Sequence, residues 1–310
     1  MKQYFPEGII FETRENKGYL ETKKCLKMAF NEEKILEARA TLCDNSHNLY
    51  VDLGCMKGFM PKNECSMGIC DGTVRDIAIV SRVNKPVAFK IVDFKYTEDG
   101  EEIAILSRKI VQEECMQNYI NTLRLGDVIS VKVTHNDYFG AFCDIGCGVS
   151  ALMPIDSISV SRIPHPNVRF RVGDKIKAVV KGIDEKGRLT LSQKELLGTW
   201  EENVKDFSQG QTVCGVVRSI EKYGIFVELT PNLAGLAELS DNVEVGDLAS
   251  VYIKSINPQK MKIKLAIVDS FKGDDSFKKT KYYFNGERMD YWCYSPENSQ
   301  KIIETSFTNS

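Results

Sequence analysis

The chain repeats its own sequence, and this repetition limits the folds open to it more than any other feature. The run Asp137–Phe142 (DYFGAF) aligns with Glu221–Phe226 (EKYGIF), and the glycines of the two runs lie 84 residues apart. Downstream, Val172–Asp174 aligns with Val245–Asp247 at an offset of 73, so the later repeat has a connection shorter by 11 residues. We therefore expect similar small domains in tandem.

A more divergent repeat precedes these two, because Val51–Gly54 aligns with Cys143–Gly146 at an offset of 92. This first repeat has lost the glycine that separates the aromatic residues in the others. Each repeat reads as about five short strands punctuated by Gly, Pro and Asp. In the second repeat the strands are expected at 127–137, 139–146, 149–154, 174–183 and 187–193.

The order and spacing of these strands predict the architecture. Gly140 lies inside a strand pattern, where a strong bend or bulge is the usual reason for glycine, and Asp184–Gly187 fits a hairpin turn. A long connection, 155–172, precedes the fourth strand. These features describe a small closed barrel of the oligonucleotide-binding (OB) type. The predicted fold class is mainly β: three tandem five-stranded OB-fold barrels joined by short helical linkers.

Three aromatic residues each share a strand face with a carboxylate two residues later, because successive side chains point to opposite faces. The pairs are Phe142 with Asp144, Phe226 with Glu228 and, in the weaker first repeat, Tyr50 with Asp52. A carboxylate is rarely buried unpaired, so these faces are expected to be solvated. Three outward aromatics at matching places indicate platforms for a flat ligand, and nucleic-acid bases are the common one.

The repeats and the segments between them give the domain boundaries. A degenerate barrel is expected at 31–109, the best-preserved one at 123–196 and a shortened one at 207–269, with linkers at 110–122 and 197–206. The terminal extensions are 1–30, with a short helix over about 17–30, and 270–310. In the latter, Tyr282–Gly286 and Tyr291–Tyr294 read as a hairpin around an Asn-Gly turn. We favour packing of its aromatics on the third barrel over an extension of an RNA surface.

The composition, 43% hydrophobic and 27% charged, fits a soluble globular protein. No apolar run approaches the length of a membrane span, so no membrane partner is expected. Ten cysteines in 310 residues are too dilute for a disulfide scaffold and are read as reduced thiols of a cytoplasmic protein. The three histidines are scattered and no cysteine pair has zinc-finger spacing, so we expect no metal and no cofactor.

The formal net charge is only −2, which argues against a bulk electrostatic binder of nucleic acid. The average conceals a difference between the repeats. Residues 121–196 carry a net +3, residues 207–269 a net −1 and residues 31–109 a net −2. The second repeat is therefore the best electrostatic docking site, although +3 is modest.

The second repeat resembles the S-one RNA-binding repeat, which is named after bacterial ribosomal protein S-one. The resemblance is carried by Leu125–Asp127, by DYFGAFCDIGCGVSALMP (137–154) and by FRVGDKIKAVVKGIDEKGRLTLSQK (170–194). The third repeat is a good but shortened match and the first is degenerate; together the three cover about two thirds of the chain. The whole chain is similar to small multi-repeat S-one-like proteins of Gram-positive bacteria.

The resemblance implies binding of single-stranded RNA through aromatic stacking. On the second repeat, the family's two stacking aromatics fall on Phe139 and Phe142. The family's Asp and Arg of the turn between strands four and five fall on Asp184 and Arg188. The family's His falls on Pro154, a departure that removes one hydrogen-bond donor.

The other repeats keep fewer of these residues. In the third, the aromatics fall on Tyr223 and Phe226, and Lys262 takes the arginine position, where it supplies a charge but not the planar fork. Glu238 stands at the His position and repels phosphate. In the first repeat only Tyr50 remains, and no arginine matches. We therefore expect RNA affinity to fall in the order second, third, first.

Each of these residues also has a plainer interpretation. Phe142 is read as facing RNA in preference to packing on a neighbouring barrel, whereas an inward orientation of Phe139 is equally open. Arg188 and Asp184 can form a surface pair across their hairpin, and such pairs are common and weak. A basic group is either a phosphate-gripping loop or, as we favour, a solvated loop face: Arg162, His165, Arg169 and Arg171.

The sequence is interpreted as a cytoplasmic protein that binds single-stranded RNA by stacking and phosphate contacts. Messenger or ribosomal RNA and the ribosome are its expected partners. The rival interpretation is an adaptor whose barrels bind proteins or the ribosomal surface without engaging free RNA, with the first barrel structural or protein-binding. We do not expect an enzyme, because the residues outside the barrels are too few for a catalytic domain and no carboxylate or His cluster suggests one.

Overall fold

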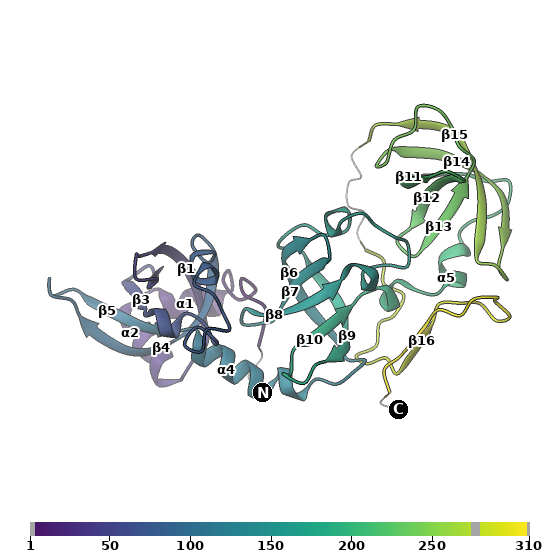
Figure 1. Ribbon diagram of the computed structural model, residues 1–310. Helices are drawn as coiled ribbons and strands as arrows, with labels where there is room; N and C mark the ends of the chain where they lie inside the picture. Colours follow the sequence, from purple (N-terminus) through teal and green to yellow (C-terminus); the bar gives the residue numbers. More distant parts are fainter. Residues whose placement is uncertain (1–3, 274–279, 309–310) are drawn as a thin grey trace. The chain divides into compact units, whose positions relative to one another are not determined.

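The computed structural model describes residues 4–273 and 280–308, and within them each repeat forms a closed five-stranded barrel (Figure 1). The predicted fold class, three tandem barrels with short helical connections, is confirmed. In every barrel the strands neighbour one another in the order first, second, third, fifth, fourth. Expectations for residues 1–3, 274–279 and 309–310 of the terminal extensions lie outside the described residues.

The first barrel closes where its third strand pairs in parallel with its fifth. Its strands are β1 (Leu36–Cys43), β2 (Leu49–Asp52), β3 (Lys57–Met60), β4 (Pro86–Tyr96) and β5 (Glu102–Ser107). Two helices precede it, α1 (Arg14–Leu20) and α2 (Lys23–Asn31), where we expected one. The break between them follows from Thr22, whose side chain accepts a hydrogen bond from the Cys25 N–H at 3.2 Å and caps a new helix.

The second barrel matches the expected strands to within about two residues at each end. Its strands are β6 (Val128–Asp137), β7 (Gly140–Gly146), β8 (Val149–Pro154), β9 (Lys175–Ile183) and β10 (Leu189–Ser192). The predicted turn joins β9 to β10, and Gly187 takes the positive φ, +73°, that the turn requires.

The glycine that begins the second strand of the second and third barrels is required by a close approach of two backbones. A Cβ atom at Gly140 would lie 2.4 Å from the Met153 carbonyl oxygen of β8. At Gly224, the equivalent position, it would lie 2.4 Å from the Ala237 carbonyl oxygen. A side chain would push the second strand away from the third at either site, so glycine separates the aromatic residues in both repeats.

The third barrel and the C-terminal extension share one core. The barrel strands are β11 (Thr212–Glu221), β12 (Gly224–Thr230), β13 (Leu233–Ala237), β14 (Leu248–Asn257) and β15 (Lys262–Phe271). Trp292, Tyr294 and Phe307 of the extension are buried with the barrel residues, as the packing interpretation predicted. The expected hairpin around Asn285–Gly286 is wrong, because β16 (Tyr291–Cys293) pairs instead with β17 (Glu304–Ser306).

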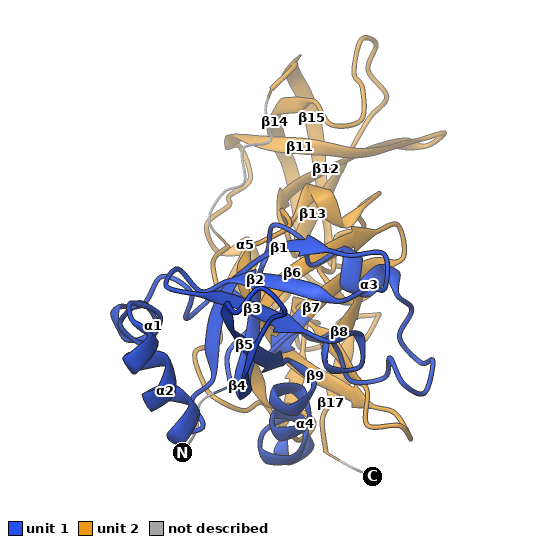
Figure 2. Ribbon diagram, turned by 90° about the vertical axis from the view of Figure 1, so that its left-hand side faces the viewer, with its two compact units in different colours: residues 1–123, 144–150 blue, residues 124–143, 151–310 orange. Residues whose placement is uncertain are grey.

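Short helices fill the connections. They are α3 (Ile77–Val80), α4 (Lys109–Asn118), α5 (Trp200–Val204), and the 3₁₀ turns η1 (Lys62–Glu64), η2 (Ile120–Thr122), η3 (Ile155–Ser157), η4 (Pro166–Val168) and η5 (Lys194–Leu197). The chain divides into two compact units, coloured separately in Figure 2: residues 1–123 with 144–150, and residues 124–143 with 151–310. The β7–β8 turn is thus grouped with the first unit.

Candidate nucleic-acid interface

The second barrel presents Phe139 and Phe142 where the chain enters β7. Their ring centroids are 5.7 Å apart and their planes are perpendicular, at 90°. Phe139 is 40% exposed and Phe142 is half-buried. Below them, the Ile155 N–H donates to the Phe139 carbonyl at 3.0 Å, and Thr134 Oγ1 donates to the Phe142 carbonyl at 3.1 Å. The opposite strand face is buried, as the alternation predicts: Ala141, Cys143 and Ile145.

The prediction that Phe142 and Asp144 lie on a solvated strand face is wrong for Asp144. The Asp144 side chain is buried, and its oxygens accept hydrogen bonds from the N–H groups of Glu7 at 2.8 Å, Gly146 at 2.9 Å and Gly148 at 3.0 Å. Burial raises the pKa of Asp144 to about 6, and the nearby Glu7 carboxylate adds to the rise. The hydrogen bonds of Asp144 could not be predicted from residue types, because their donors are backbone N–H groups. Phe142 is therefore partly covered rather than fully in solvent.

Asp184 and Arg188 form the surface pair that the plainer interpretation predicted. Arg188 Nε donates to Asp184 Oδ2 at 2.7 Å, while Asp184 Oδ1 accepts the N–H groups of Lys186 and Arg188, each at 2.9 Å. Hydrogen bonds from the backbone and side chain of Arg188 hold the pKa of Asp184 below its usual range. The Arg188 side chain is 74% exposed, so Asp184 orients a guanidinium that solvent, or a phosphate, can still reach.

The third barrel repeats the perpendicular aromatic pair. The rings of Tyr223 and Phe226 lie 6.1 Å apart at 89°, and Tyr223 is exposed while Phe226 is half-buried. Lys262 is exposed at the start of β15. The register runs from Phe226 through Leu236 to Lys264, so the exposed Lys264 stands in the same row as the aromatic. Sequence reasoning missed Lys264, although its spacing of two from Lys262 puts both on one strand face.

Glu228, the second carboxylate of the solvation argument, is also buried. Arg218 donates to it from Nε and Nη2 at 3.1 Å each, and Arg169 donates from Nη1 at 2.8 Å and from Nη2. The basic loop was predicted to be either a solvated face or a phosphate-binding loop, and both predictions are wrong for Arg169. Its side chain is buried and is paired with Glu228. It ties the connection after η4 of the second barrel to β12 of the third.

The first barrel carries Tyr50 with a partner that the sequence did not reveal. Phe59 lies opposite Tyr50 in the β2–β3 pair, with ring centroids 5.4 Å apart at 64°. The register extends this contact into an apolar row across four strands, all of whose members are at least partly exposed: Leu42, Tyr50, Phe59 and Ile105. Here the carboxylate does face solvent, since Asp52 is exposed and accepts the Gly54 N–H at 2.8 Å.

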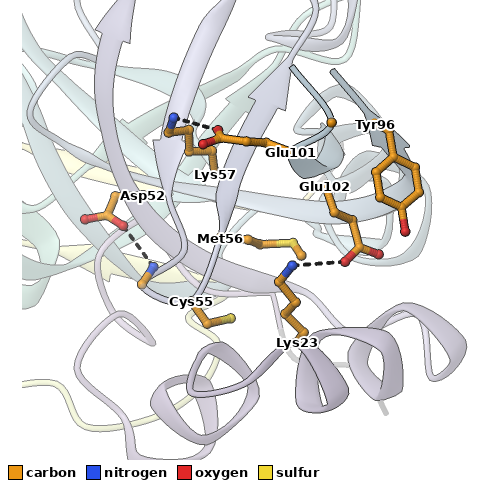
Figure 3. A pocket seen from close by; sticks show the side chains of 10 residues that line it. Lys23, Asp52, Cys55, Met56, Lys57, Tyr96, Glu101 and Glu102 are labelled. Atoms are coloured by element: carbon orange, nitrogen blue, oxygen red, sulfur yellow. Dashed lines mark hydrogen bonds and ion pairs between the residues drawn. The ribbon is translucent and has the colours of Figure 1, made fainter. Parts of the chain in front are cut away.

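The first unit also holds a pocket of about 540 Å³ beside α2, shown in Figure 3. Four of its charged side chains form two ion pairs, with Lys23 Nζ at 3.2 Å from Glu102 and Lys57 Nζ at 2.9 Å from Glu101. None of the residues predicted to bind RNA lines this pocket. Its opposite charges largely neutralise one another, which separates it in character from the aromatic surfaces.

Over residues 4–273 and 280–308, no three or more His, Cys, Asp or Glu side chains are grouped so as to hold a metal ion. Within the same ranges, no helix has the length and apolar character needed to cross a bilayer.

Comparison with known proteins gives a family match and relatives along most of the chain. Residues 122–194 match the S1 RNA binding domain. The chain is 28% identical over 300 residues to the small ribosomal subunit protein bS1 of Staphylococcus aureus (strain COL), covering 90% of this chain and 72% of the relative. It is also 28% identical over 278 residues to bS1 of Leuconostoc lactis, covering 82% of this chain and 62% of the relative.

One solved structure covers a similar share of the chain. It is a multidomain protein with nucleic acid binding domains from Streptococcus pneumoniae TIGR4, at 12% identity over 76% of this chain and 74% of that one. The TM-score is 0.25.

Proposed function

We propose that this chain, which is an S1-like protein with an S1 RNA binding domain and tandem barrels of the same topology, binds single-stranded RNA. One observation carries the proposal. The second and third barrels present a perpendicular pair of partly exposed aromatic rings at the same place, Phe139 with Phe142 and Tyr223 with Phe226. A repeated surface of this kind suits bases, because every base has a face that can stack on a ring.

The affinity should come from stacking, assisted by a few cations. Each base stacked on an aromatic side chain contributes ~1–3 kcal/mol with little dependence on sequence. Arg188, oriented by Asp184, can bind a phosphate with two parallel hydrogen bonds or stack on a base. In the third barrel Lys262 and Lys264 supply charge without that geometry. The second barrel is therefore the main binding site and the third the weaker one.

The relatives suggest where this binding acts. The proteins matched along most of the chain are described as small ribosomal subunit proteins, not as enzymes. This supports messenger or ribosomal RNA as the ligand, the ribosome as a partner, and the cytoplasm as the compartment.

A second candidate function, that of a protein-binding adaptor, is favoured by the first barrel. Its outer row of Leu42, Tyr50, Phe59 and Ile105 is apolar, with no cation in the row. Apolar exposed rows suit protein contacts better than phosphate contacts. On this view the second and third barrels would also bind protein or the ribosomal surface, and free RNA would not be a ligand.

Binding of the full chain to a single-stranded oligouridylate of about 12 nucleotides separates the two functions, since OB folds occupy roughly 4–16 nucleotides. We expect saturable binding that an RNA duplex of equal length does not compete away. The logarithm of the affinity should fall with the logarithm of salt by about 0.7 per phosphate neutralised. A shallow slope, equivalent to a few phosphates, is expected because few cations line the rings. No binding at low salt would reject the RNA function in favour of the adaptor.

A further inference from the structure

Two more rings continue the Phe139–Phe142 pair of the second barrel, one at each end. The Tyr138 ring lies 5.4 Å from the Phe139 ring at 88°, and the His135 ring lies 6.0 Å from the Phe142 ring at 27°. Tyr138 is 74% exposed, and His135 on β6 is exposed. The four side chains Tyr138, Phe139, Phe142 and His135 thus form one unbroken sequence of ring contacts, here named the aromatic run.

The third barrel lacks the two outer rings of the aromatic run. The repeat offset of 84 puts Ser219 where the second barrel has His135, and Ser219 pairs with Phe226 in the β11–β12 register. The ring contact between His135 and Phe142 therefore has no counterpart there. At the other end of the run, Lys222 replaces the tyrosine. The third barrel keeps the central pair alone.

The first barrel has no aromatic run either. Leu42 pairs with Tyr50 in the β1–β2 register, and the offset of 92 puts its neighbour Cys43 at the position of the histidine, so neither residue at that place carries a ring. The offset of 92 puts Ser46 at the position of the tyrosine. Among the three barrels that the structure describes, the four-ring surface belongs to the second, which is also the most basic repeat, at +3.

We propose that Tyr138 and His135 contact RNA and lengthen the stacking platform of the second barrel beyond Phe139 and Phe142. This rests on the proposed function of the same barrel. Three consecutive rings stand nearly perpendicular, so a base lying on the face of one meets the edge of the next, where the ring carries partial positive charge. The ligand class is unpaired RNA, whose bases are free to stack.

The backbone around the aromatic run is already fixed. Asn136 Nδ2 donates to the Phe170 carbonyl at 2.8 Å and to Asn167 Oδ1 at 2.9 Å, which secures the end of β6 next to His135. The Tyr138 N–H is held by Asp137 Oδ1 at 2.7 Å. A platform whose backbone is ordered before binding loses less conformational entropy when RNA arrives, so its outer rings can contribute to affinity.

The test measures affinity of the full chain for oligouridylates from about 4 to about 16 nucleotides, the range of OB-fold site sizes. Tyr138→Ala and His135→Ser each remove one ring, and Tyr138→Phe and His135→Phe keep a ring without the polar atoms. Ser219→Ala, at the equivalent position of the third barrel, is the matched control. Phe142→Ala reports on the central pair, and circular dichroism checks that each variant folds.

We expect Tyr138→Ala and His135→Ser to weaken binding of the longer oligomers by roughly 5-fold or more each, the lower end for loss of one stacked base. For these two variants, affinity should also stop rising at a shorter RNA length than it does for the parent. The affinities of Tyr138→Phe, His135→Phe and Ser219→Ala should stay near that of the parent. If both ring-removing variants bind as the parent does while Phe142→Ala loses affinity, RNA contacts only the central pair of rings. This inference is then wrong, while the proposed RNA function stands. If Phe142→Ala is also neutral, the proposed RNA function fails with it.

Discussion

The first and second barrels share a strand order and differ in what they show on the same outer face. The second shows the aromatic run together with an exposed Arg188. The first shows an apolar row that ends at Asp93, next to Ile105 in the register. Their inward faces are alike, since both bury aliphatic side chains in a closed barrel. The fold is thus set by the inward residues, and on the proposed function the outward residues decide whether a barrel binds RNA.

The carboxylate two residues after the aromatic residue is buried in the second and third barrels and exposed in the first. Removal of the buried Glu228 should have the largest effect on stability. Glu228→Ala leaves Arg169 and Arg218 buried without their shared carboxylate, and breaking a buried pair costs about 3–5 kcal/mol. We expect a clear fall in the denaturant midpoint of the unit that contains the third barrel. Glu238→Ala, which removes an exposed carboxylate paired with Lys254, is the control and should change stability little.

An equal and small effect of the two substitutions would mean that the buried cluster does not hold the third barrel to the connection after η4. The comparison between the barrels would then rest on their surface rings alone.

The stability of the first barrel should depend on pH through Glu37, which has no part in the second barrel. Burial raises the pKa of Glu37 to about 8 from an ordinary 4.5, although the Gly8 N–H, at 2.9 Å, opposes the rise. The folded state therefore keeps this proton to higher pH than the unfolded chain. The stability is fully present below about pH 4.5 and is lost as pH rises through about 8, with a slope near 1.4 kcal/mol per pH unit.

The first unit should thus lose roughly 2 kcal/mol between about pH 6 and about pH 8, and Glu37→Gln should remove this dependence. Thermal melts of both proteins across that range measure it, with the exposed Glu101→Gln as control. RNA affinity is expected not to follow the stability of the first unit over the same range if the second barrel is the binding site. Affinity that falls together with the stability of the first unit would show that the first barrel takes part.

Phe142→Ala tests the second barrel directly. The substitution should weaken RNA binding by ~1–3 kcal/mol, the contribution of one stacked base. The ring is half-buried, so a small loss of stability is also expected, in contrast to a fully exposed side chain. Tyr96→Ala, which removes an exposed ring of the first barrel, should leave affinity unchanged. A large loss of stability with unchanged RNA affinity would identify Phe142 as a packing residue.

Arg188→Ala should have the smallest effect. It removes one exposed cation near the platform, so the salt dependence of RNA binding should become shallower by at most about 0.7, the value for one phosphate on a single strand. Lys186→Ala, in the same turn, removes a charge without disturbing the ion pair with Asp184 and serves as the control. Identical salt slopes for all three proteins would remove Arg188 from the phosphate contacts.

Much of the fold could be predicted because its signals are local and repeated. The glycine at 140 and again at 224, and the Asp184–Gly187 turn, gave the strand boundaries of the second barrel to within about two residues. The C-terminal pairing could not be found this way. Asn285–Gly286 has a strong turn sequence, but packing of Trp292 and Tyr294 in the core of the third barrel directs the segment elsewhere.

The candidate site could be predicted in part. Alternation along a strand predicted an outward Phe142 and Phe226, and both rings are half-buried. The orientation of Phe139 was open from the sequence, and its ring is 40% exposed. The role of these rings in binding stays a proposal. The two buried carboxylates could not be foreseen, because each has a partner far away in sequence, Glu7 for Asp144 and Arg169 for Glu228. The contact of His135 with Phe142 depends on the pairing of neighbouring strands.

The most direct test of the account compares RNA affinities of two variants of the full chain, with folding checked by circular dichroism. Phe139→Ala combined with Phe142→Ala removes the central rings of the second barrel, and Tyr50→Ala removes the corresponding ring of the first. We expect the double variant to lose most of the affinity for a single-stranded oligouridylate and Tyr50→Ala to change it little. An equal loss in both would contradict the division between the barrels, and no loss in either would contradict RNA binding through these rings.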